Sequence, residues 1–384
     1  MKNAKNNIST CLKISIFKKM HLSIIIPAFN NYSYTKKCIL SFNRSNLPDK
    51  HEILVIDNNS TDETAKFLSV LNFQNLKVIK NKRNFGFAYA CNQGARQSFG
   101  NHIIFLNNDT EVTANWVDGL TKCLTSNRNI GIVGCKLLYP DSTVQHSGVA
   151  FSSIKVHHIY RNFAPSHPAV NKQREFKAVT AACMMVPRKL FLSLGGFDES
   201  FINGFEDLDF CFRARSKGYK VMYTPESVVI HHESKTPGRH DHHAHNARLF
   251  ASRWLSSIDH DLDKIYAEDG LRRHLEFEKK LGGKWLEDSN PNHFWDQARS
   301  LVISGEYADA ENFFDQALSF NPYDVRRLSI AEELSDLYVK WGRISDAEQC
   351  LDAIIQVTPS KRLLQKKARI ATMAPHLPSD LSQK

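Results

Sequence analysis

Short apolar segments alternate with amphipathic ones over the first 110 residues. The apolar segments are rich in isoleucine, valine and leucine, which is typical of strands buried on both faces of a parallel sheet; they span 22–27, 53–57, 76–80 and 102–106. The intervening segments have helical spacing and span 33–43, 60–68 and 88–99. Ser60 with Glu63 forms a capping-box pattern, which predicts a helix start. The alternation predicts an α/β fold with a doubly wound, mostly parallel sheet.

Polar residues follow each of the four predicted strands. They occupy positions 28–31, 57–59, 81–84 and 107–109. In doubly wound sheets, ligands bind beyond the carboxyl ends of the strands. The pattern therefore brings Asp57, Asp109, Lys82, Arg83 and several amide side chains to one edge, where we expect the ligand site.

The next hundred residues have a looser pattern of mixed strands and loops. Within them, an acidic segment predicts a helix from Glu206 to about Lys217, ended by Gly218. The segment SVVIHHES predicts a closing strand that ends in His231 and His232.

The C-terminal region contains an internal repeat. Gly305 and Gly342 lie 37 positions apart. The segments YADAE (307–311) and ISDAE (344–348) have the same separation, and so do the pairs Asn321-Pro322 and Thr358-Pro359. This register predicts two tetratricopeptide-like helical hairpins, slightly longer than the consensus of about 34 residues. Two repeats are fewer than such arrays usually need, so we expect them to pack on linker helices or on another copy of the chain.

At 384 residues the chain is long for one domain. We predict five regions along it: a basic leader (1–20), the α/β domain (21–250), a helical linker (251–290), the helical repeats (291–360) and a basic C-terminal tail (361–384). The overall fold class is thus an α/β domain followed by an all-α repeat region.

Composition places the chain among soluble globular proteins. It is 42% hydrophobic and 23% charged, and no apolar run approaches the ~20 residues of a membrane helix. The leader lacks the features of a secretory signal. The eight cysteines of the whole chain include no CxxC pair, which favours reduced thiols. We therefore expect a cytoplasmic protein. The net charge of +10 is spread along the chain, which argues against nucleic acid and favours peripheral contact with the inner face of the cytoplasmic membrane.

Six motifs in a fixed order carry a resemblance to a known family. They are SIIIPAFNNYSYT, VIDNNSTDET, KNKRNFGFAYACNQGA, FLNNDTEV, GGFDESFINGFEDLDFCFR and HHES. Together they resemble the family 2 glycosyltransferases with a GT-A fold, especially bacterial rhamnosyltransferase-like members. The resemblance runs from about Leu22 to Lys235 and leaves the helical repeats outside it.

The resemblance implies a Rossmann-like nucleotide-sugar domain and an inverting, metal-dependent glycosyltransferase. Such an enzyme moves a hexosyl or deoxyhexosyl group from a nucleotide-diphosphate sugar to a hydroxyl acceptor. The expected setting is synthesis of bacterial cell-surface polysaccharide, O-antigen or capsule, with a glycan or lipid-linked glycan as acceptor.

Sugar transfer from a diphosphate requires neutralisation of a negatively charged leaving group, which a divalent cation supplies. The resemblance places the metal-binding DxD-type motif at residues 107–109, where Asp109 matches the metal ligand and Asn107 replaces the first acid. His231 corresponds to the histidine that completes the metal site, and His232 is the alternative if the register shifts by one. Carboxylates suit Mg²⁺ or Mn²⁺, and an imidazole ligand favours Mn²⁺. A turn or helix cap is the alternative role for Asp109.

The resemblance also implies the donor-binding and catalytic residues. Asp57 would accept a hydrogen bond from the donor base, and the other donor-binding residues are Pro27, Ala28, Asn30, Arg83, Asn84, Gly86, Asn107 and Asn108. Inversion needs a base near the acceptor hydroxyl. Among the acids of the predicted helix, the family pattern assigns this role to Asp207 and an orienting role to Glu206. Favourable interaction with the helix dipole is the alternative explanation for these acids.

Three alternatives remain open at this stage. Helical repeats often bind peptides, so one alternative is that the acceptor is a protein that docks on the repeats. The repeats could equally bind a partner protein or a second copy of the chain. The replacement of an acid by Asn107 alternatively indicates a non-catalytic scaffold. A zinc site at His240, His242, His243 and His245 lacks cysteine partners and structural-site spacing, and we favour a loop over the donor there.

Overall fold

The computed structural model describes residues 21–152, 155–233, 241–271, 292–318, 324–357 and 361–372. They divide into two compact units. The first comprises the described residues from 21 to 271 except 162–164, which group with the second, helical unit at 292–372. The predicted leader and residues 272–290 of the predicted linker lie outside the described residues.

The four predicted parallel strands are present. They are β1 (His21–Ala28), β2 (Lys50–Asp57), β3 (Leu76–Lys80) and β4 (His102–Leu106), in the sheet order β4-β1-β2-β3. All three pairings are parallel, and Ala28 lies beside Asp57, which lies beside Lys80. The carboxyl ends of β1, β2 and β3 therefore reach the same edge, as predicted.

The loosely patterned segment completes the sheet with strands of both directions. β11 (Cys183–Pro187) runs antiparallel between β4 and β6 (Ile130–Leu138), and β12 (Lys220–His231) runs parallel to β6. β10 (Arg174–Phe176) pairs with β12 at the edge, where β5 (Thr110–Val112) also joins β12, and β7 (Val144–His146) joins β6. β8 (Val149–Ser152) and β9 (Lys155–His158) form a separate pair. The predicted fold class is confirmed.

One irregularity in β12 affects the residues beyond it. Thr224 pairs with Cys135 of β6, whereas the next pair joins Val228 to Lys136. Residues 225–227 are therefore extra residues on the β12 side, a bulge before the strand reaches His231.

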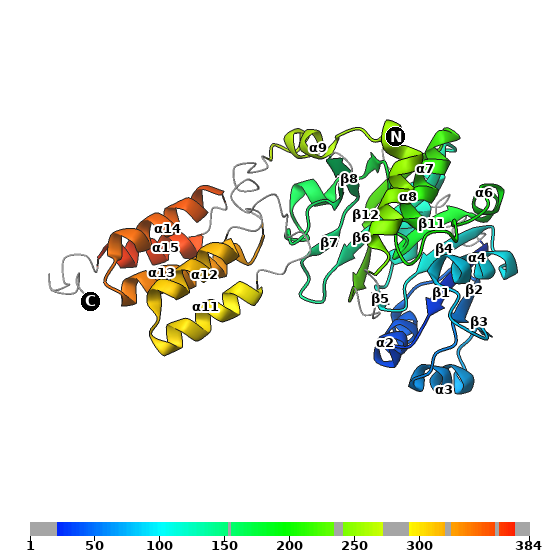
Figure 1. Ribbon diagram of the computed structural model, residues 1–384, viewed down its shortest axis with the longest axis horizontal. Coiled ribbons are helices and arrows are strands. Elements are labelled where there is room, and N and C mark those ends of the chain that lie inside the picture. Colours follow the sequence, from blue (N-terminus) through cyan, green and yellow to red (C-terminus); the bar gives the residue numbers. More distant parts are fainter. Residues whose placement is uncertain are drawn as a thin grey trace, which may run out of the picture. The chain divides into compact units, whose positions relative to one another are not determined.

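Helices cover both faces of the sheet. α2 (Tyr32–Ser41), α3 (Glu63–Val70) and α5 (Trp116–Ser126) contribute to one core with alternate β1 residues Leu22, Ile24 and Ile26. Ile25 faces the other way, against Gly94 of α4 (Phe87–Gln97), where an added Cβ would meet the isoleucine at 2.5 Å. Figure 1 shows α2 and α3 on one side of β1–β3 and α4 on the other. This arrangement confirms the doubly wound prediction.

The second face is built largely from aromatic side chains. α6 (Arg188–Ser193) and α7 (Glu206–Ser216) contribute to a cluster of Phe105, Phe191, Phe197 and Phe210. α8 (His243–Trp254) packs on α7 through Phe212 and Phe250, whose rings are 5.2 Å apart (Figure 1). Gly218, with φ +82°, follows α7 as predicted. The remaining helices of this unit are η1 (Phe42–Arg44), η2 (Pro168–Asn171), η3 (Leu255–Ser257) and α9 (Leu262–Glu268).

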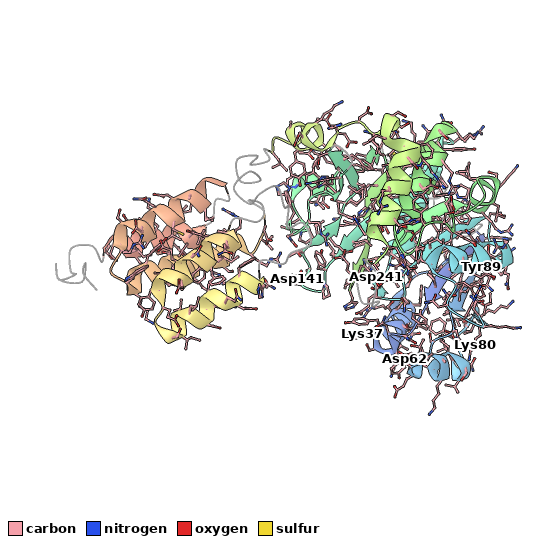
Figure 2. All side chains as sticks on the ribbon, viewed as in Figure 1. Lys37, Asp62, Lys80, Tyr89, Asp141 and Asp241 are labelled. Carbon is pink, nitrogen blue, oxygen red and sulfur yellow. The ribbon has the colours of Figure 1, made fainter. Side chains whose placement is uncertain are left out.

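The capping box predicted at Ser60 is wrong. α3 begins at Glu63, and its cap is Asp62, labelled in Figure 2, whose carboxylate accepts from Thr64 N at 2.9 Å. Ser60 N instead donates to Asp57 Oδ1 (2.8 Å), and Ser60 Oγ accepts from Asn30 N (2.9 Å). Ser60 therefore connects the ends of β1 and β2, and the aspartate nearer the helix is the cap.

Within its described residues, the helical unit contains two hairpins and a fifth helix. The helices are α11 (Asn292–Ser304), α12 (Tyr307–Leu318), α13 (Arg327–Lys340), α14 (Ile344–Val357) and α15 (Lys361–Ala371). Gly305 and Gly342 have nearly the same φ, +85° and +80°, at the two hairpin turns. Ala310 and Ala347, also 37 positions apart, are both completely buried. The repeated hairpins match the predicted register, and their tetratricopeptide identity stays a prediction; the Asn-Pro and Thr-Pro pairs lie outside the described residues.

The predicted basic tail begins with a helix. In α15, Leu363 and Ile370 are almost fully buried in the helical core, and seven positions bring them to the same helix face. Lys366 and Lys367 form ion pairs with Asp336 and with Asp352 of α14. This corrects the tail prediction for residues 361–371, because the basic residues lie on the outer side of an amphipathic helix.

Candidate functional site

The loops after β1, β2 and β3 are connected by side-chain amides. Asn30 Oδ1 accepts from Thr61 N (2.7 Å), and Asn58 Nδ2 donates to Gly86 O (3.0 Å). Pro27 and Ala28 are buried at the end of β1. Asp57 is 1% exposed, and its Oδ1 accepts from Ser60 N. The Asp57 carboxylate thus stabilises the turn after β2, and its predicted contact with a donor base stays a prediction.

The loop between β3 and α4 presents polar side chains at the same edge. Arg83 and Asn84 are exposed, and the Arg83 guanidinium lies over the Phe85 ring, 4.7 Å from its centre. Asn84 Oδ1 accepts from Gly86 N at 2.9 Å, and Gly86 adopts φ +88° at the start of α4. Phe87 N donates to Asn203 Oδ1, which connects this loop to the segment before α7.

Asp109 and His231 come together where β5 pairs with the end of β12. In that pairing, His231 lies opposite Thr110, next to Asp109. His231 Nε2 is 3.1 Å from Asp109 Oδ1 and 3.4 Å from Asn107 Nδ2. Asp109 and His231 are 7% and 3% exposed. The structure thus brings the two predicted metal ligands and Asn107 into contact.

The Asn107 and Asn108 side chains have different surroundings. Asn107 Oδ1 is buried and has no hydrogen-bond partner within the described part of the chain. A buried acceptor without a partner is costly in a native protein and calls for an explanation such as an unseen ion. Asn108 Nδ2 instead donates to Thr35 Oγ1 of α2 at 2.8 Å. The Asn107 side chain therefore lies beside His231, which its Nδ2 approaches to 3.4 Å, whereas Asn108 is held by α2.

His232 occupies a different environment from His231. Its Nε2 lies 2.9 Å from Glu111 Oε1, and its ring packs against Tyr34 with centres 4.9 Å apart. Burial raises the pKa of Glu111, but hydrogen bonds from His232 and Arg44 bring that pKa below its ordinary value. The geometry favours His231 over His232 as the partner of Asp109.

The first turn of α7 holds the predicted catalytic acids. Asp207 Oδ2 accepts from Ala181 N, and its Oδ1 accepts from Leu208 N, both at 2.9 Å. The carbonyl oxygen of the next residue, Ala182, accepts a hydrogen bond from Asn107 N (3.0 Å). Glu206 is 5% exposed, and its Oε2 accepts from Gly204 N at 2.6 Å. The structure therefore connects Asp207 to the Asn107 loop through two neighbouring residues, while Glu206 binds its own preceding loop.

Asp209, two residues after Asp207, has a structural environment. Its side chain is 1% exposed and forms ion pairs with Arg213 (2.7 Å) and Arg253 (3.1 Å). Trp254 Nε1 donates to it as well, at 2.9 Å. Since Arg253 and Trp254 are in α8, Asp209 joins α8 to α7.

Replacing Asp209 with asparagine is expected to lower the free energy of unfolding by about 3 kcal/mol, because the buried arginine contacts lose their counter-charge. The midpoint of urea unfolding, followed by circular dichroism, measures this. Glu226→Gln is the control, since the exposed pair of Glu226 with Lys122 contributes at most about 1 kcal/mol. Equal midpoints for the two variants would contradict a structural role for Asp209.

Sequence reasoning missed Gln145, which contacts His231. Gln145 is in the three-residue strand β7 and is 2% exposed. Its Oε1 lies 2.7 Å from His231 Nδ1. A strand of three residues is too short to show a periodic pattern. The one available signal was an amide residue next to an apolar one, Gln145 after Val144, in a segment with little regular pattern.

Within the described residues, the histidines of the alternative zinc site, at 242, 243 and 245, form no metal cluster. The His243 ring packs against Phe205 at 5.4 Å, at the start of α8, and His240 lies outside the described residues. Across the described ranges, no group of three or more His, Cys, Asp or Glu residues is arranged to hold a metal ion. Among the helices that the structure describes, none is long and apolar enough to cross a membrane.

Part of the chain is similar to known proteins. Residues 23–193 match the model of Glycosyl transferase family 2. The O-antigen biosynthesis protein RfbC of Myxococcus xanthus is 33% identical over 71% of this chain and 22% of its own length. The N-acetylglucosaminyl-diphospho-decaprenol L-rhamnosyltransferase of Mycobacterium tuberculosis is 25% identical over 54% of this chain and 74% of its own.

A solved structure of GalNAc-T7 with UDP, GalNAc and Mn²⁺ aligns with a TM-score of 0.48 and 18% identity, over 68% of this chain and 56% of that one. The chain spans about a quarter of the length of the first two sequence relatives. The matched segment contains β1 to β4, the Asn107 loop and β11. The chain therefore carries a glycosyl transferase family 2 domain.

Proposed function

We propose that the protein is an inverting, metal-dependent glycosyltransferase that uses a nucleotide-diphosphate sugar. The observation that carries the proposal is the contact of Asp109, His231 and Asn107 at the carboxyl edge of the sheet, connected to Asp207 through Ala181 and Ala182. That edge is where doubly wound sheets bind their ligands.

The residues at this contact fit a divalent cation. Asp109 Oδ1 and His231 Nε2 are 3.1 Å apart, and neighbouring ligands of an octahedral ion with bonds of about 2.1 Å are separated by a similar distance. Asn107 Oδ1 adds a neutral oxygen that has no partner in the structure as described. Asp109 and His231 would hold the ion, which supplies positive charge to a departing diphosphate. The mixed oxygen and nitrogen set favours Mn²⁺ over Mg²⁺.

The chain's own groups account for the remaining requirements of the reaction. In the proposal, the exposed Arg83 and Asn84 bind the donor together with Pro27, Ala28, Asn30, Asp57, Gly86 and Asn108. Asp207 removes the proton from the acceptor hydroxyl as it attacks the anomeric carbon. Hydrogen bonds from Ala181 N and Leu208 N fix the orientation of this carboxylate. Glu206 holds the loop before α7 and thereby orients Asp207.

The proposed acceptor is a glycan or lipid-linked glycan in the synthesis of bacterial cell-surface polysaccharide. Two relatives support this, because their names describe O-antigen biosynthesis and rhamnosyl transfer to a diphospho-decaprenol-linked sugar. A cytoplasmic protein at the inner membrane face would meet such an acceptor, consistent with the net charge of +10. The two helical hairpins favour a second candidate, a protein acceptor docked on the repeats.

A screen of nucleotide sugars by mass spectrometry tests the proposal. Each donor is incubated with the full chain and Mn²⁺ without acceptor, because slow donor hydrolysis reports on cleavage of the anomeric bond. We expect hydrolysis of at least one donor and its loss with EDTA. Wild-type protein that neither cleaves any donor nor binds a nucleoside diphosphate in Mn²⁺ would refute the enzyme and favour a non-catalytic scaffold.

A further inference from the structure

The buried amide of Gln145 contacts His231 at two points. Gln145 Oε1 lies 2.7 Å from His231 Nδ1, and Gln145 Nε2 donates to the His231 carbonyl oxygen at 3.2 Å. Both residues are nearly inaccessible, at 2% and 3% exposure. We propose that Gln145 is a positioning residue that fixes the ring tautomer of His231, so that Nε2 offers its lone pair to a divalent cation. This inference rests on the proposed function of the site.

The backbone carbonyl determines which way the Gln145 amide points. A carbonyl oxygen only accepts hydrogen bonds, so the amide atom 3.2 Å from His231 O is the NH₂ group. The Gln145 oxygen then faces His231 Nδ1. Because that oxygen only accepts, Nδ1 must carry the proton. In the neutral imidazole, Nε2 is left unprotonated.

An unprotonated Nε2 has a specific consequence on the other side of the ring. It lies 3.1 Å from Asp109 Oδ1, so two electron-rich atoms face each other. A cation between them turns this repulsion into attraction. Asn107 Nδ2, 3.4 Å from Nε2, is oriented as a donor to the same lone pair. In the opposite tautomer, Nε2–H would donate directly to Asp109 and close the site to a metal.

Residues that hydrogen-bond to the free ring nitrogen of a metal-bound histidine commonly act in this way. They donate or accept at the second ring nitrogen and orient the ring, and their loss lowers metal affinity by about 10- to 100-fold. Here the partner comes from β7, a strand outside the motifs of the family resemblance. β7 is paired with β6, which runs beside β12, so the amide and the imidazole are held by neighbouring strands of one sheet.

The tautomer is measured first, on the metal-free full-length chain. Long-range proton–nitrogen NMR distinguishes the two tautomers of a histidine ring. His231→Gln identifies the His231 signal among the 17 histidines. We expect Nδ1–H in the wild type and in Gln145→Glu, which keeps an acceptor at this position. In Gln145→Leu we expect a substantial Nε2–H population. An Nε2–H ring in the wild type would overturn the inference.

Mn²⁺ affinity is measured next by electron paramagnetic resonance, with the metal ion alone as the probe. Gln145→Leu is expected to weaken binding by about 10- to 100-fold, and Gln145→Glu should remain within about 3-fold of wild type. Tyr223→Phe is the control, because it removes a buried hydrogen bond from β12 to Val170 O without touching the site. Wild type and Gln145→Leu binding Mn²⁺ equally would overturn the role of Gln145, whereas a wild type that binds none would overturn the proposed metal site itself.

Discussion

Asp207→Asn is expected to lower the rate of sugar transfer, or of donor hydrolysis, by about 100- to 10,000-fold while the protein stays folded. The asparagine oxygen can still accept from Ala181 N, as the aspartate does at 2.9 Å. The side chain therefore keeps its place, but the amide cannot accept the hydroxyl proton. Nucleoside diphosphate binding in Mn²⁺, measured by calorimetry, should be unchanged, because the proposed role of Asp207 is on the acceptor.

Asp209 offers the matched comparison for this prediction, two residues along the same helix. Its carboxylate is occupied by Arg213 and Arg253, so Asp209→Asn should reduce stability and leave the rate per folded molecule near that of wild type. The two variants thus separate chemistry from folding. If Asp207→Asn retained more than a tenth of the wild-type rate, Asp207 would not be the base, and Glu206→Gln would be the next variant to measure.

Asp109→Asn is expected to weaken Mn²⁺-dependent binding of a nucleoside diphosphate and to lower turnover, each by more than about 100-fold. Loss of the only acid in the Asn107–Asp109 loop would remove the charge that holds the proposed cation, and several kcal/mol of leaving-group stabilisation would go with it. His231→Gln should have a similar effect, since His231 Nε2 contacts Asp109. Calorimetric titration with UDP and GDP in Mn²⁺ measures the change in affinity.

The neighbouring pair of Glu111 and His232 provides the controls. Glu111 and His232 contact each other at 2.9 Å. Glu111 is two positions after Asp109, and His232 is one position after His231. Glu111→Gln and His232→Gln should therefore leave nucleotide affinity within about 3-fold of wild type. A large loss in His232→Gln together with a small one in His231→Gln would reverse the assignment of the metal ligand.

Much of the first unit was predictable because its signals are local. The four strands are each five to eight residues long. Burial on both faces gives β1, β2 and β4 their apolar runs, while β3, at the sheet edge, is only partly buried. Once their parallel order is inferred, sheet geometry alone brings the polar residues that follow them to one edge. The helix at Glu206 and its end at Gly218 were predictable for the same reason, since acidic first turns and left-handed glycines are short-range features.

The missed features depend on contacts between distant segments. Gln145 gains its position from the pairing of β7 with β6, and no local pattern encodes this. Ser60 and Asp62 are both suitable N-cap residues for α3. Ser60 Oγ instead accepts a hydrogen bond from Asn30 N, thirty residues earlier in the chain, which leaves Asp62 as the cap. For α15, the basic residues dominated the composition, and only the spacing of Leu363 and Ile370 carried the helical signal. The roles of the site residues remain proposals, since they depend on ligands that sequence patterns do not specify.

The bulge at residues 225–227 decides which imidazole meets Asp109. Side chains alternate between the two faces of a strand, and three additional residues shift that alternation by one relative to β6. His231 and His232 are the same type of residue, so their side chains differ only in position. The number of extra residues in the bulge upstream determines which of the two rings faces Asp109. An insertion or deletion of one residue there would exchange the two rings, so a change well away from the chemistry would abolish the proposed cation site without altering any of its proposed ligands.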